Sequence, residues 1–421
     1  MGPSPTSSAV RPQAVPKGTV KLPFKPCGLR RSVTVLRKPY PSLSFMAQIL
    51  LRRLVGISLV MFCFTGCPPA ETNTPDAAVT NKPTTSTPAK EVDPEQVVQQ
   101  IHQCDAKTKQ DSSGNIVEVD LRPASASQDL WPDLAKLSRL RSLILGEGTL
   151  DREDLAVIAN ITTSRNLDLR QNMVTGPDLA ALQSLQDLRA LRLSGKTNST
   201  LDGGGLEAIL QLPKLKVLAL DFMWVGTPEL EQLQALSKIE ELYLAGTLVD
   251  DEALQVISQF TQLKKLRIAQ TQVSDAGLAH LSKVKTLVSL DLSEITTISN
   301  MGLEHLSPLT QLVRLNLWRV PVSDAGIAHL APLIHLEWLN LDNTGLTDEG
   351  LASLSQMKKL NYLHLGSTSV TDPGLVHLET LVALRDLKVT RTAVTSDGVA
   401  ALQAKLPDAA IQLKYLGDGG G

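Results

Sequence analysis

The stretch FTQLKKLRIAQTQVSDAGLAHLSK, residues 260–283, contains the pattern that decides the fold of this chain. Leu266 and Ile268 alternate with polar and small residues, and a period of two over a short run indicates a strand with one buried face. Leu278 and Leu281 lie three residues apart, which gives the following segment one apolar side as a short helix. One copy of the pattern therefore predicts a strand, a turn and a helix.

The pattern returns twelve times between Ser113 and Leu402, at intervals of about 24 residues. Two intervals are longer, by three residues at Lys196–Gly205 and by one residue near Ile295–Ile298. Both additions fall between a predicted strand and a predicted helix, where loops tolerate insertion. After the first repeat, which begins near Ser113, the other eleven start at Leu137, Ile161, Leu185, Leu212, Leu236, Phe260, Val284, Leu309, Leu333, Met357 and Leu381.

A single repeat cannot fold by itself. Its roughly seven buried apolar side chains contribute about 10–20 kcal/mol, whereas ordering the backbone costs about 1–2 kcal/mol for every residue. Repeats must therefore stack and share their buried faces. Stacked strands lie about 4.8 Å apart and helices are about 10 Å wide, so the stack must bend. We predict an α/β fold: a right-handed horseshoe solenoid with a concave parallel sheet and convex helices.

The repeat resembles the leucine-rich repeat, whose period is 20 to 29 residues. Two phrases, Val-Ser-Asp-Ala-Gly-Leu-Ala-His-Leu at 273–281 and Leu-Thr-Asp-Glu-Gly-Leu-Ala-Ser-Leu at 346–354, are similar to its cysteine-containing type. The resemblance covers about residues 113–413. It implies a binding solenoid and says little about the partner. Threonine stands where that type often has Cys or Asn, at Thr247, Thr271, Thr344, Thr368 and Thr392.

Both ends of the repeat region have the features of caps. Asp93 is predicted to cap a helix with Pro94 in its first turn and Gln96 completing a capping box. This N-terminal cap spans residues 93–112, and its apolar side is expected to cover the first repeat with Val97, Val98 and Ile101. The repeat domain spans residues 113–416, with a closing strand at Ile411 and Leu413, and residues 417–421 form a glycine-rich flexible tail.

Residues 46–66 are predicted to be a secretory signal, with a basic start, an apolar run at Leu54–Phe64 and small residues before Cys67. The run is too short for an ordinary transmembrane helix. The segment resembles a bacterial lipoprotein signal, and this resemblance implies cleavage before Cys67 and lipid attachment to it. The alternative is ordinary secretion without a lipid.

The segments on either side of this signal differ from it in composition. Residues 1–45 contain eight Lys and Arg and no acid. They are interpreted either as the product of a start codon placed too early, with Met46 the true start, or as a longer targeting extension. Residues 67–92 are rich in Pro, Thr and Ala, and they are predicted to be a disordered tether because that composition cannot form a core.

Charge and motifs exclude several classes of function. The chain carries a formal charge of −2, and residues 1–66 contain ten bases and no acid, so the remainder carries −2 − 10 = −12. An acidic body argues against nucleic acid as a partner. No phosphate loop, HExxH or GxSxG motif occurs, and Gly203-Gly204-Gly205 is interpreted as a turn. We therefore predict neither an enzyme nor a cofactor.

Four histidines recur at one position of the repeat. Stacked imidazoles are able to bind zinc, but adjacent helices lie about 10 Å apart, which is too far for two of them to share a metal easily. We therefore predict surface histidines of the repeat consensus and no metal. They are His280, His305, His329 and His377.

One outward position of every strand is expected to line the concave face. Asp168 beside Arg192 and Arg267 beside Asp291 are predicted to form opposite-charge pairs across strands, and neighbouring asparagines are predicted to form an amide ladder. The face is otherwise mixed in charge. In chain order, this position is occupied by Asp120, Ile144, Asp168, Arg192, Ala219, Tyr243, Arg267, Asp291, Asn316, Asn340, His364 and Lys388.

The chain has four Trp and four Tyr, and four of these eight are predicted to point outward from strands. Because Trp and Tyr are favoured residues at interfaces, the C-terminal part of the concave face is the predicted binding site, with packing between the aromatic rings as the alternative reading. The loop Phe222-Met223-Trp224 is a lesser candidate, either exposed or filling the gap made by the insertion. The predicted site comprises Tyr243, Arg267, Asp291, Arg314, Asn316, Trp318, Trp338, Asn340, Tyr362 and His364.

Three functions remain open at this point. The first is a protein-binding scaffold held at the cell envelope, periplasmic or on the outer face, by a lipid on Cys67. The second is a carbohydrate or cell-wall binder that uses the aromatic residues. The third is an effector or ubiquitin-ligase adaptor, because similar repeats form the substrate-recognition part of F-box ligases. No F-box-like stretch precedes Ser113.

Overall fold

The computed structural model describes residues 93–123 and 130–414. The chain divides into two units, Met1–Pro83 and Thr84–Gly421, and the fold below is that of the second. The predicted signal, tether and tail, and with them Cys67, lie outside the described residues. Within these residues, no helix combines the length and the apolar character needed to cross a membrane.

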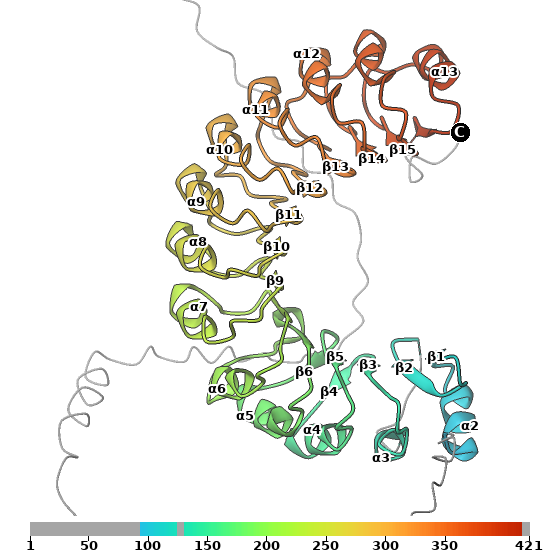
Figure 1. Cartoon of the computed structure of the whole chain (residues 1–421), viewed down its shortest axis with the longest axis vertical. Helices are drawn as coiled ribbons and strands as arrows, with labels where there is room; N and C mark the ends of the chain where they lie inside the picture. Colours follow the sequence, from blue (N-terminus) through green and yellow to red (C-terminus); the bar gives the residue numbers. More distant parts are fainter. Residues whose placement is uncertain (1–92, 124–129, 415–421) are drawn as a thin grey trace, which may run out of the picture. The chain divides into compact units, whose positions relative to one another are not determined.

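The second unit is a stack of coils with its strands on the inner side and its helices on the outer side (Figure 1). Among the described residues, its main sheet has 14 strands, in which β1 is antiparallel to β2 and all further neighbours are parallel. The strands are β1 (Lys107–Gln110), β2 (Ile116–Asp120), β3 (Ser142–Ile144), β5 (Asn166–Asp168), β7 (Ala190–Ser194), β8 (Val217–Asp221), β9 (Glu241–Tyr243), β10 (Lys265–Arg267), β11 (Ser289–Asp291), β12 (Arg314–Asn316), β13 (Trp338–Asn340), β14 (Tyr362–His364), β15 (Asp386–Lys388) and β16 (Ala410–Gln412).

One short helix follows almost every strand. The α-helices are α2 (Glu95–Gln103), α3 (Trp131–Leu134), α4 (Arg152–Ala159), α5 (Gly176–Leu179), α6 (Gly205–Leu210), α7 (Thr227–Leu233), α8 (Asp251–Ile257), α9 (Asp275–Leu281), α10 (Asn300–Glu304), α11 (Asp324–Ala328), α12 (Asp348–Leu351) and α13 (Ser396–Lys405). Short 3₁₀ turns are η2 (Ala180–Ser184), η3 (Gly195–Thr197), η4 (Ala352–Leu354) and η5 (Asp372–Leu378). The predicted α/β solenoid is confirmed.

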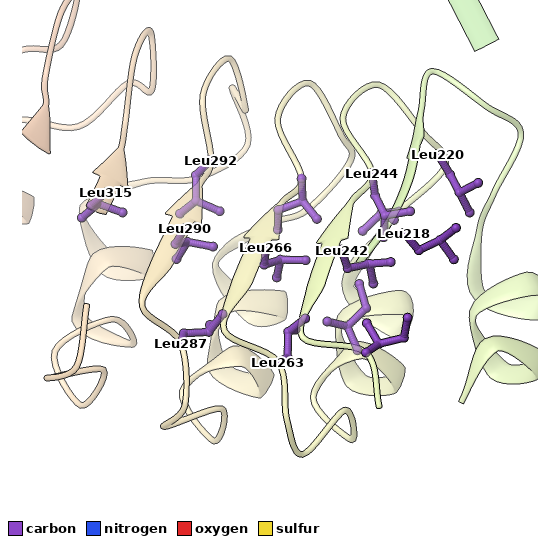
Figure 2. Packing of buried hydrophobic residues seen from close by; sticks show 14 of the residues in the cluster. Leu218, Leu220, Leu242, Leu244, Leu263, Leu266, Leu287, Leu290, Leu292 and Leu315 are labelled. Atoms are coloured by element: carbon purple, nitrogen blue, oxygen red, sulfur yellow. The ribbon is translucent and has the colours of Figure 1, made fainter. Parts of the chain in front are cut away.

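The core is one continuous column of apolar side chains between the sheet and the helices. Leu266 pairs in register with Leu242 on one side and Leu290 on the other, and all three are almost fully buried. Figure 2 shows how the leucines of successive coils lie against one another in this column. Because each coil buries its apolar face against its neighbours, the stack supplies the core that a single repeat lacks.

The repeated Ser-Asp-x-Gly phrase forms a ladder of side-chain hydrogen bonds between neighbouring coils. In one rung, the Asp324 carboxylate accepts hydrogen bonds from the backbone N–H of Thr347 at 2.8 Å and from its hydroxyl at 2.6 Å. A Cβ atom on Gly350 would lie 2.3 Å from Asp324 Oδ1, so glycine leaves room for the carboxylate. The ladder has six acceptors, Asp251, Asp275, Asn300, Asp324, Asp348 and Asp372.

The recurring threonines have a structural role in the turn after each strand. The hydroxyl of Thr271 donates a hydrogen bond of 2.6 Å to the carbonyl of Ile268, three residues earlier. The turn also contains one residue with a positive φ, as at Gln270. The same hydroxyl bond is made by Thr247, Thr344, Thr368 and Thr392.

Two features of the N-terminal cap differ from the prediction. Pro94, not Asp93, is the N-cap residue of α2 and no side chain caps this helix. The Asp93 carboxylate instead accepts a hydrogen bond from the backbone N–H of Ile116, because this N–H at the start of β2 is buried. The strand β1 was not predicted; it pairs with the edge of β2 that parallel stacking leaves open. Val97 and Ile101 are buried against the first coil, as expected.

Candidate functional site

The outward strand positions form one in-register row across the sheet, in which Asp120, Asp168 and Ala219 are buried. Asp120 pairs with Ile144 at one end, and the same register continues through Asn316 and Asn340 to His364 and Lys388. Each strand is bonded to the next at the equivalent position, so the row predicted from the repeat is confirmed. All ten residues of the predicted site are half-buried or exposed.

Four side chains from four successive strands stack against one another in the C-terminal part of the sheet, and we call them the cation–aromatic stack. The rings of Trp338 and Tyr362 are nearly parallel, at 6°, with centroids 4.9 Å apart. The guanidinium of Arg314 lies 4.6 Å from the Trp338 centroid, and the Lys388 ammonium lies 5.3 Å from the Tyr362 centroid. Because the strands follow in the order β12, β13, β14 and β15, each ring is covered on both faces.

The remaining two outward aromatics lie apart from this stack. Trp318 is two residues beyond the end of β12, and its ring contact is with Arg319, whose guanidinium lies 5.5 Å from the ring centroid. The hydroxyl of Tyr243 donates a hydrogen bond of 2.8 Å to Glu241 on its own strand. Burial and this carboxylate raise the pKa of Tyr243 above its ordinary value. The sequence therefore predicted four outward aromatics, of which the structure brings two together.

The predicted charge pairs are correct in one case and wrong in the other. Arg267 lies 3.4 Å from Asp291, as predicted, and it also reaches Asp221 at 3.3 Å on the other side. Asp168 binds Arg170 in the turn after its strand, with Nε at 2.9 Å from Oδ1, and not Arg192. The backbone N–H of Arg170 also donates a hydrogen bond to the Asp168 carboxylate at 3.2 Å, which brings this arginine close to it.

The predicted pairings of Arg192 and of the asparagines are also wrong. Arg192 donates a hydrogen bond to the side chain of Asn166 on the neighbouring strand. Asn316 Oδ1 accepts a hydrogen bond from the backbone N–H of Trp318 at 3.2 Å, and Asn340 Oδ1 accepts one from Asp342 N–H at 3.0 Å. Each of these amides therefore binds the turn after its own strand, because its oxygen reaches an N–H two residues onward.

His364 adds a titratable group beside the stack. Burial is the main influence and lowers the pKa of His364 below 6.5, and the Lys388 ammonium lowers it further. The carboxylates of Asp342 and Asp386 act in the opposite direction and do not overcome this shift. The fixed positive charges of the stack are those of Arg314 and Lys388.

A pocket of about 630 Å³ lies at the carboxyl ends of β2, β3, β5, β7 and β8. Two of its basic groups lie in turns and are held by the last residue of the preceding strand, Arg122 by Asp120 at 2.7 Å and Arg170 by Asp168 at 2.6 Å. Gly146 occupies the equivalent position after β3, between these two arginines, where a Cβ would lie 2.7 Å from the Leu121 carbonyl oxygen. The third basic group, the Lys196 ammonium, lies 4.0 Å from the Phe222 ring centroid.

The same pocket contains carboxylates, so it is mixed in charge. Asp221 lines the pocket, where burial raises its pKa. Sequence reasoning missed this pocket because it followed the row of strand residues and stopped two positions short of the arginines. The signal that would have found it is the sequence Arg122, Gly146, Arg170 at equivalent positions of consecutive repeats.

The lesser candidate loop has one strongly exposed member. Trp224 is 85% exposed, whereas Met223 is 2% exposed. Phe222 is half-buried and its backbone adopts a positive φ of 62°. Of the two readings offered by the sequence, exposure is therefore correct for Trp224 and gap filling is correct for Met223.

The repeated histidines are half-buried on their helices. Across residues 93–123 and 130–414, no three or more His, Cys, Asp or Glu side chains are grouped so that they would hold a metal ion. The strand row, the stack and the two loop features are therefore the functional candidates that the described residues offer.

With this geometry in place, comparison with known families agrees with the architecture. The family described as "Leucine-rich repeat region" matches residues 121–400. The chain belongs to this family. Leucine-rich repeats are typical of binding scaffolds that do not catalyse reactions, and the match indicates no enzyme family. A comparison with curated proteins finds no match.

Several solved structures are similar to this chain at low identity. An internalin from Listeria monocytogenes shares 19% identity over 77% of this chain and 94% of its own, with a TM-score of 0.49. An internalin C2 from the same species shares 20% identity over 50% of this chain and 84% of its own, at 0.40. The plant peptide hormone receptor RGFR1 in complex with RGF2 shares 16% identity over 67% and 49%, at 0.39. Similarity at this level carries no information about what this chain binds.

Proposed function

We propose that this chain is a non-catalytic scaffold that binds a protein partner through the C-terminal part of its concave sheet. The observation that carries the proposal is the cation–aromatic stack, in which Arg314, Trp338, Tyr362 and Lys388 stand side by side on four strands. Aromatic and arginine side chains are the residues most often responsible for binding energy at protein interfaces. Their support by a rigid sheet keeps the ordering cost of binding low.

The covered ring faces favour a protein partner over a carbohydrate. Sugars bind aromatic side chains by lying flat on a free ring face, but Trp338 has Arg314 on one face and Tyr362 on the other. Arg314 is exposed, and both rings and Lys388 are half-buried. An acidic group placed near Arg314 or Lys388, with apolar contact to the ring edges, fits this arrangement through charge complementarity.

A second part of the proposal concerns location. The lipoprotein-like sequence before Cys67 supports a tether to the cell envelope, periplasmic or outer-facing, by a lipid on that cysteine. Replacement of Cys67 by Ser is expected to release the protein from membranes and to abolish incorporation of labelled palmitate. If Cys67→Ser stayed on membranes without incorporating label, the lipid tether would be contradicted. The proposal for the binding face would not be affected by this result.

The binding face is tested with two variants of the full chain used as bait for envelope proteins. Trp338→Ala with Tyr362→Ala removes the rings of the stack, and we expect capture of the partner to fall about tenfold or more. Trp318→Ala alone removes the aromatic that lies apart, and a much smaller loss is expected. His280→Ala, on a helix of the outer side, is the matched control.

The readout is the amount of each captured protein by quantitative mass spectrometry, with circular dichroism to check the fold of every variant. The stack is excluded as the contact if the double variant retains full capture while folded. A carbohydrate function would instead be supported if glycan binding by the wild type were lost in Trp338→Ala.

A further inference from the structure

Trp224, in the loop between β8 and α7, is the most exposed large apolar side chain of the described residues, at 85%. Its neighbours Met223 and Val225 are 2% and 0% exposed, so both sides of the tryptophan are anchored in the core. Leu248 on the next coil is 54% exposed, and its N–H donates a hydrogen bond of 2.9 Å to the Val225 carbonyl. The exposure of Trp224 is therefore a fixed property of the loop.

A pocket of about 470 Å³ opens beside this tryptophan. It exists because the coil that starts at Leu185 is three residues longer than the others, and the extra chain passes through Gly203 and Gly204 with φ of +61° and +102°. A Cβ on Gly203 would approach Pro177 to 3.0 Å, so a small residue is favoured there. The insertion forms one wall, and α6 and α7 form the others.

The pocket is lined by carboxylates and by no basic residue. Glu229 accepts a hydrogen bond of 2.9 Å from the backbone N–H of Gly226, and Asp202 accepts one from the Thr200 hydroxyl. Glu207 is exposed and makes no hydrogen bond or ion pair with any described residue. Carboxylates in the first turn of a helix are stabilising without any ligand, which accounts for Glu207 and Glu229 but not for an exposed indole beside them.

We propose that this pocket binds a lysine or arginine side chain of a protein partner. Trp is the best aromatic surface for a cation, and the carboxylates of Glu207 and Glu229 would neutralise the charge from the side. Leu248 extends the contact with apolar surface for residues next to the basic one. The site lies on the loop edge and shares no residue with the concave cation–aromatic stack, so it is a second, independent contact region.

The test titrates the full chain with an acetylated hexa-arginine peptide and follows Trp fluorescence. A hexa-citrulline peptide of equal length lacks the charge and is the matched probe. We expect the arginine peptide to bind, the citrulline peptide to bind at least about tenfold more weakly, and added salt to weaken binding.

Variants locate the binding on the protein. Because Trp224→Ala removes one of the four tryptophans that contribute to the fluorescence signal, its binding is measured by anisotropy of a labelled peptide, and a loss of about tenfold is expected. Glu207→Gln with Glu229→Gln keeps the hydrogen-bonding shape and is expected to lose a similar factor. Glu231→Gln with Glu252→Gln removes two exposed acids outside the pocket and is expected to have little effect.

The proposal is overturned if the wild type does not bind the arginine peptide, if citrulline binds equally well, or if the two pairs of acid variants lose the same affinity. The variant Trp338→Ala with Tyr362→Ala is expected to bind the peptide normally. This result separates the loop pocket from the concave face, so that failure of one proposal leaves the other intact.

Discussion

The two halves of the repeat stack share one core but join their coils differently. In the regular half, residues 236–413, a carboxylate or amide of one coil bonds the next at every step from Asp251 onward. In the variable half, residues 116–235, the described coils are joined by individual side-chain bonds, such as that from the Asn172 amide to the Gly146 carbonyl at 2.9 Å, and by close backbone contacts, since a Cβ on Gly176 would lie 1.6 Å from the Asp202 carbonyl oxygen. The regular half therefore repeats one kind of joint and has an insertion of a single residue, whereas the variable half accommodates a three-residue insertion.

This difference in joining coincides with a difference in surface. The pockets of about 630 and 470 Å³ both lie in the variable half. The regular half carries the cation–aromatic stack, in which Arg314, Trp338 and Tyr362 stand at one register and Lys388 reaches the Tyr362 ring from two residues further along β15. Even spacing produces an extended contact face, whereas an irregular loop produces concave sites. The following three experiments test this contrast, beginning with the largest expected effect.

Removal of a core leucine is expected to be equally costly in both halves. Leu191 in β7 and Leu315 in β12 are both 0% exposed and belong to the same apolar column. Each Leu→Ala change is expected to lower the free energy of unfolding by about 2–5 kcal/mol, measured by urea denaturation. Val382→Ala, at a site 69% exposed, serves as control. If Leu191→Ala were nearly neutral, the column would not be continuous across the halves.

Removal of one rung of the side-chain ladder is expected to have the second largest effect on the free energy of unfolding. Asp324→Ala leaves the N–H and hydroxyl of Thr347 without their acceptor, and a loss of about 1–3 kcal/mol in unfolding free energy is expected. Asp324→Asn is the matched control, because Asn300 already makes this rung with Oδ1 at 2.8 Å from Ser323 N and Nδ2 at 2.9 Å from its hydroxyl. Equal effects of Ala and Asn would mean that the bonds do not stabilise the stack.

The smallest effect is expected at Glu240, where the two halves meet. Lys216 of the variable half and Lys264 of the regular half both contact this carboxylate, and they lower its pKa from 4.5 to about 2. As the pH falls, Glu240 is protonated in the unfolded chain before it is protonated in the folded one. The stabilisation is therefore complete above pH 4.5 and is lost progressively toward pH 2.

Glu240→Gln is expected to flatten this part of the stability profile, measured as the urea midpoint between pH 6 and pH 2. The Glu241→Gln variant, whose carboxylate binds Lys265 at 2.7 Å within the regular half, is the comparison. An unchanged slope in Glu240→Gln would show that the contacts across the boundary do not contribute.

The sequence predicted the parts of the structure that periodicity determines. An apolar residue recurs in each coil at the position of Leu266, which pairs with an equivalent leucine on each side. The strand register, the buried face of the sheet and the outward row all follow from this recurrence. The polar strand at Lys107–Gln110 has no apolar alternation, so nothing in its sequence distinguishes it from a loop. It forms because the edge of β2 offers free hydrogen-bonding groups, which is a property of the assembled sheet.

The candidate sites were predicted less completely, because side-chain partners depend on three-dimensional neighbours. The outward position of Trp338 and Tyr362 followed from the repeat, but their stacking and the cations on both outer faces did not. Likewise, Asp168 has two arginines within reach, and only the structure decides for Arg170 over Arg192. The pocket beside Trp224 depends on the path of an insertion, which has no repeat to predict it.

The hydrogen bonds between Asp324 and Thr347 also bear on the number of coils that the stack is able to contain. Each joint of the regular half presents the same acceptor on one side and the same donors on the other, so any coil is able to follow any other. Excision of residues 333–356 would bring Asp324 against Thr371, whose N–H and hydroxyl already donate the equivalent hydrogen bonds to Asp348. A closed barrel fixes the number of its strands, whereas this open array allows its reach to grow or shrink by whole coils, with the size of the contact face changing in proportion.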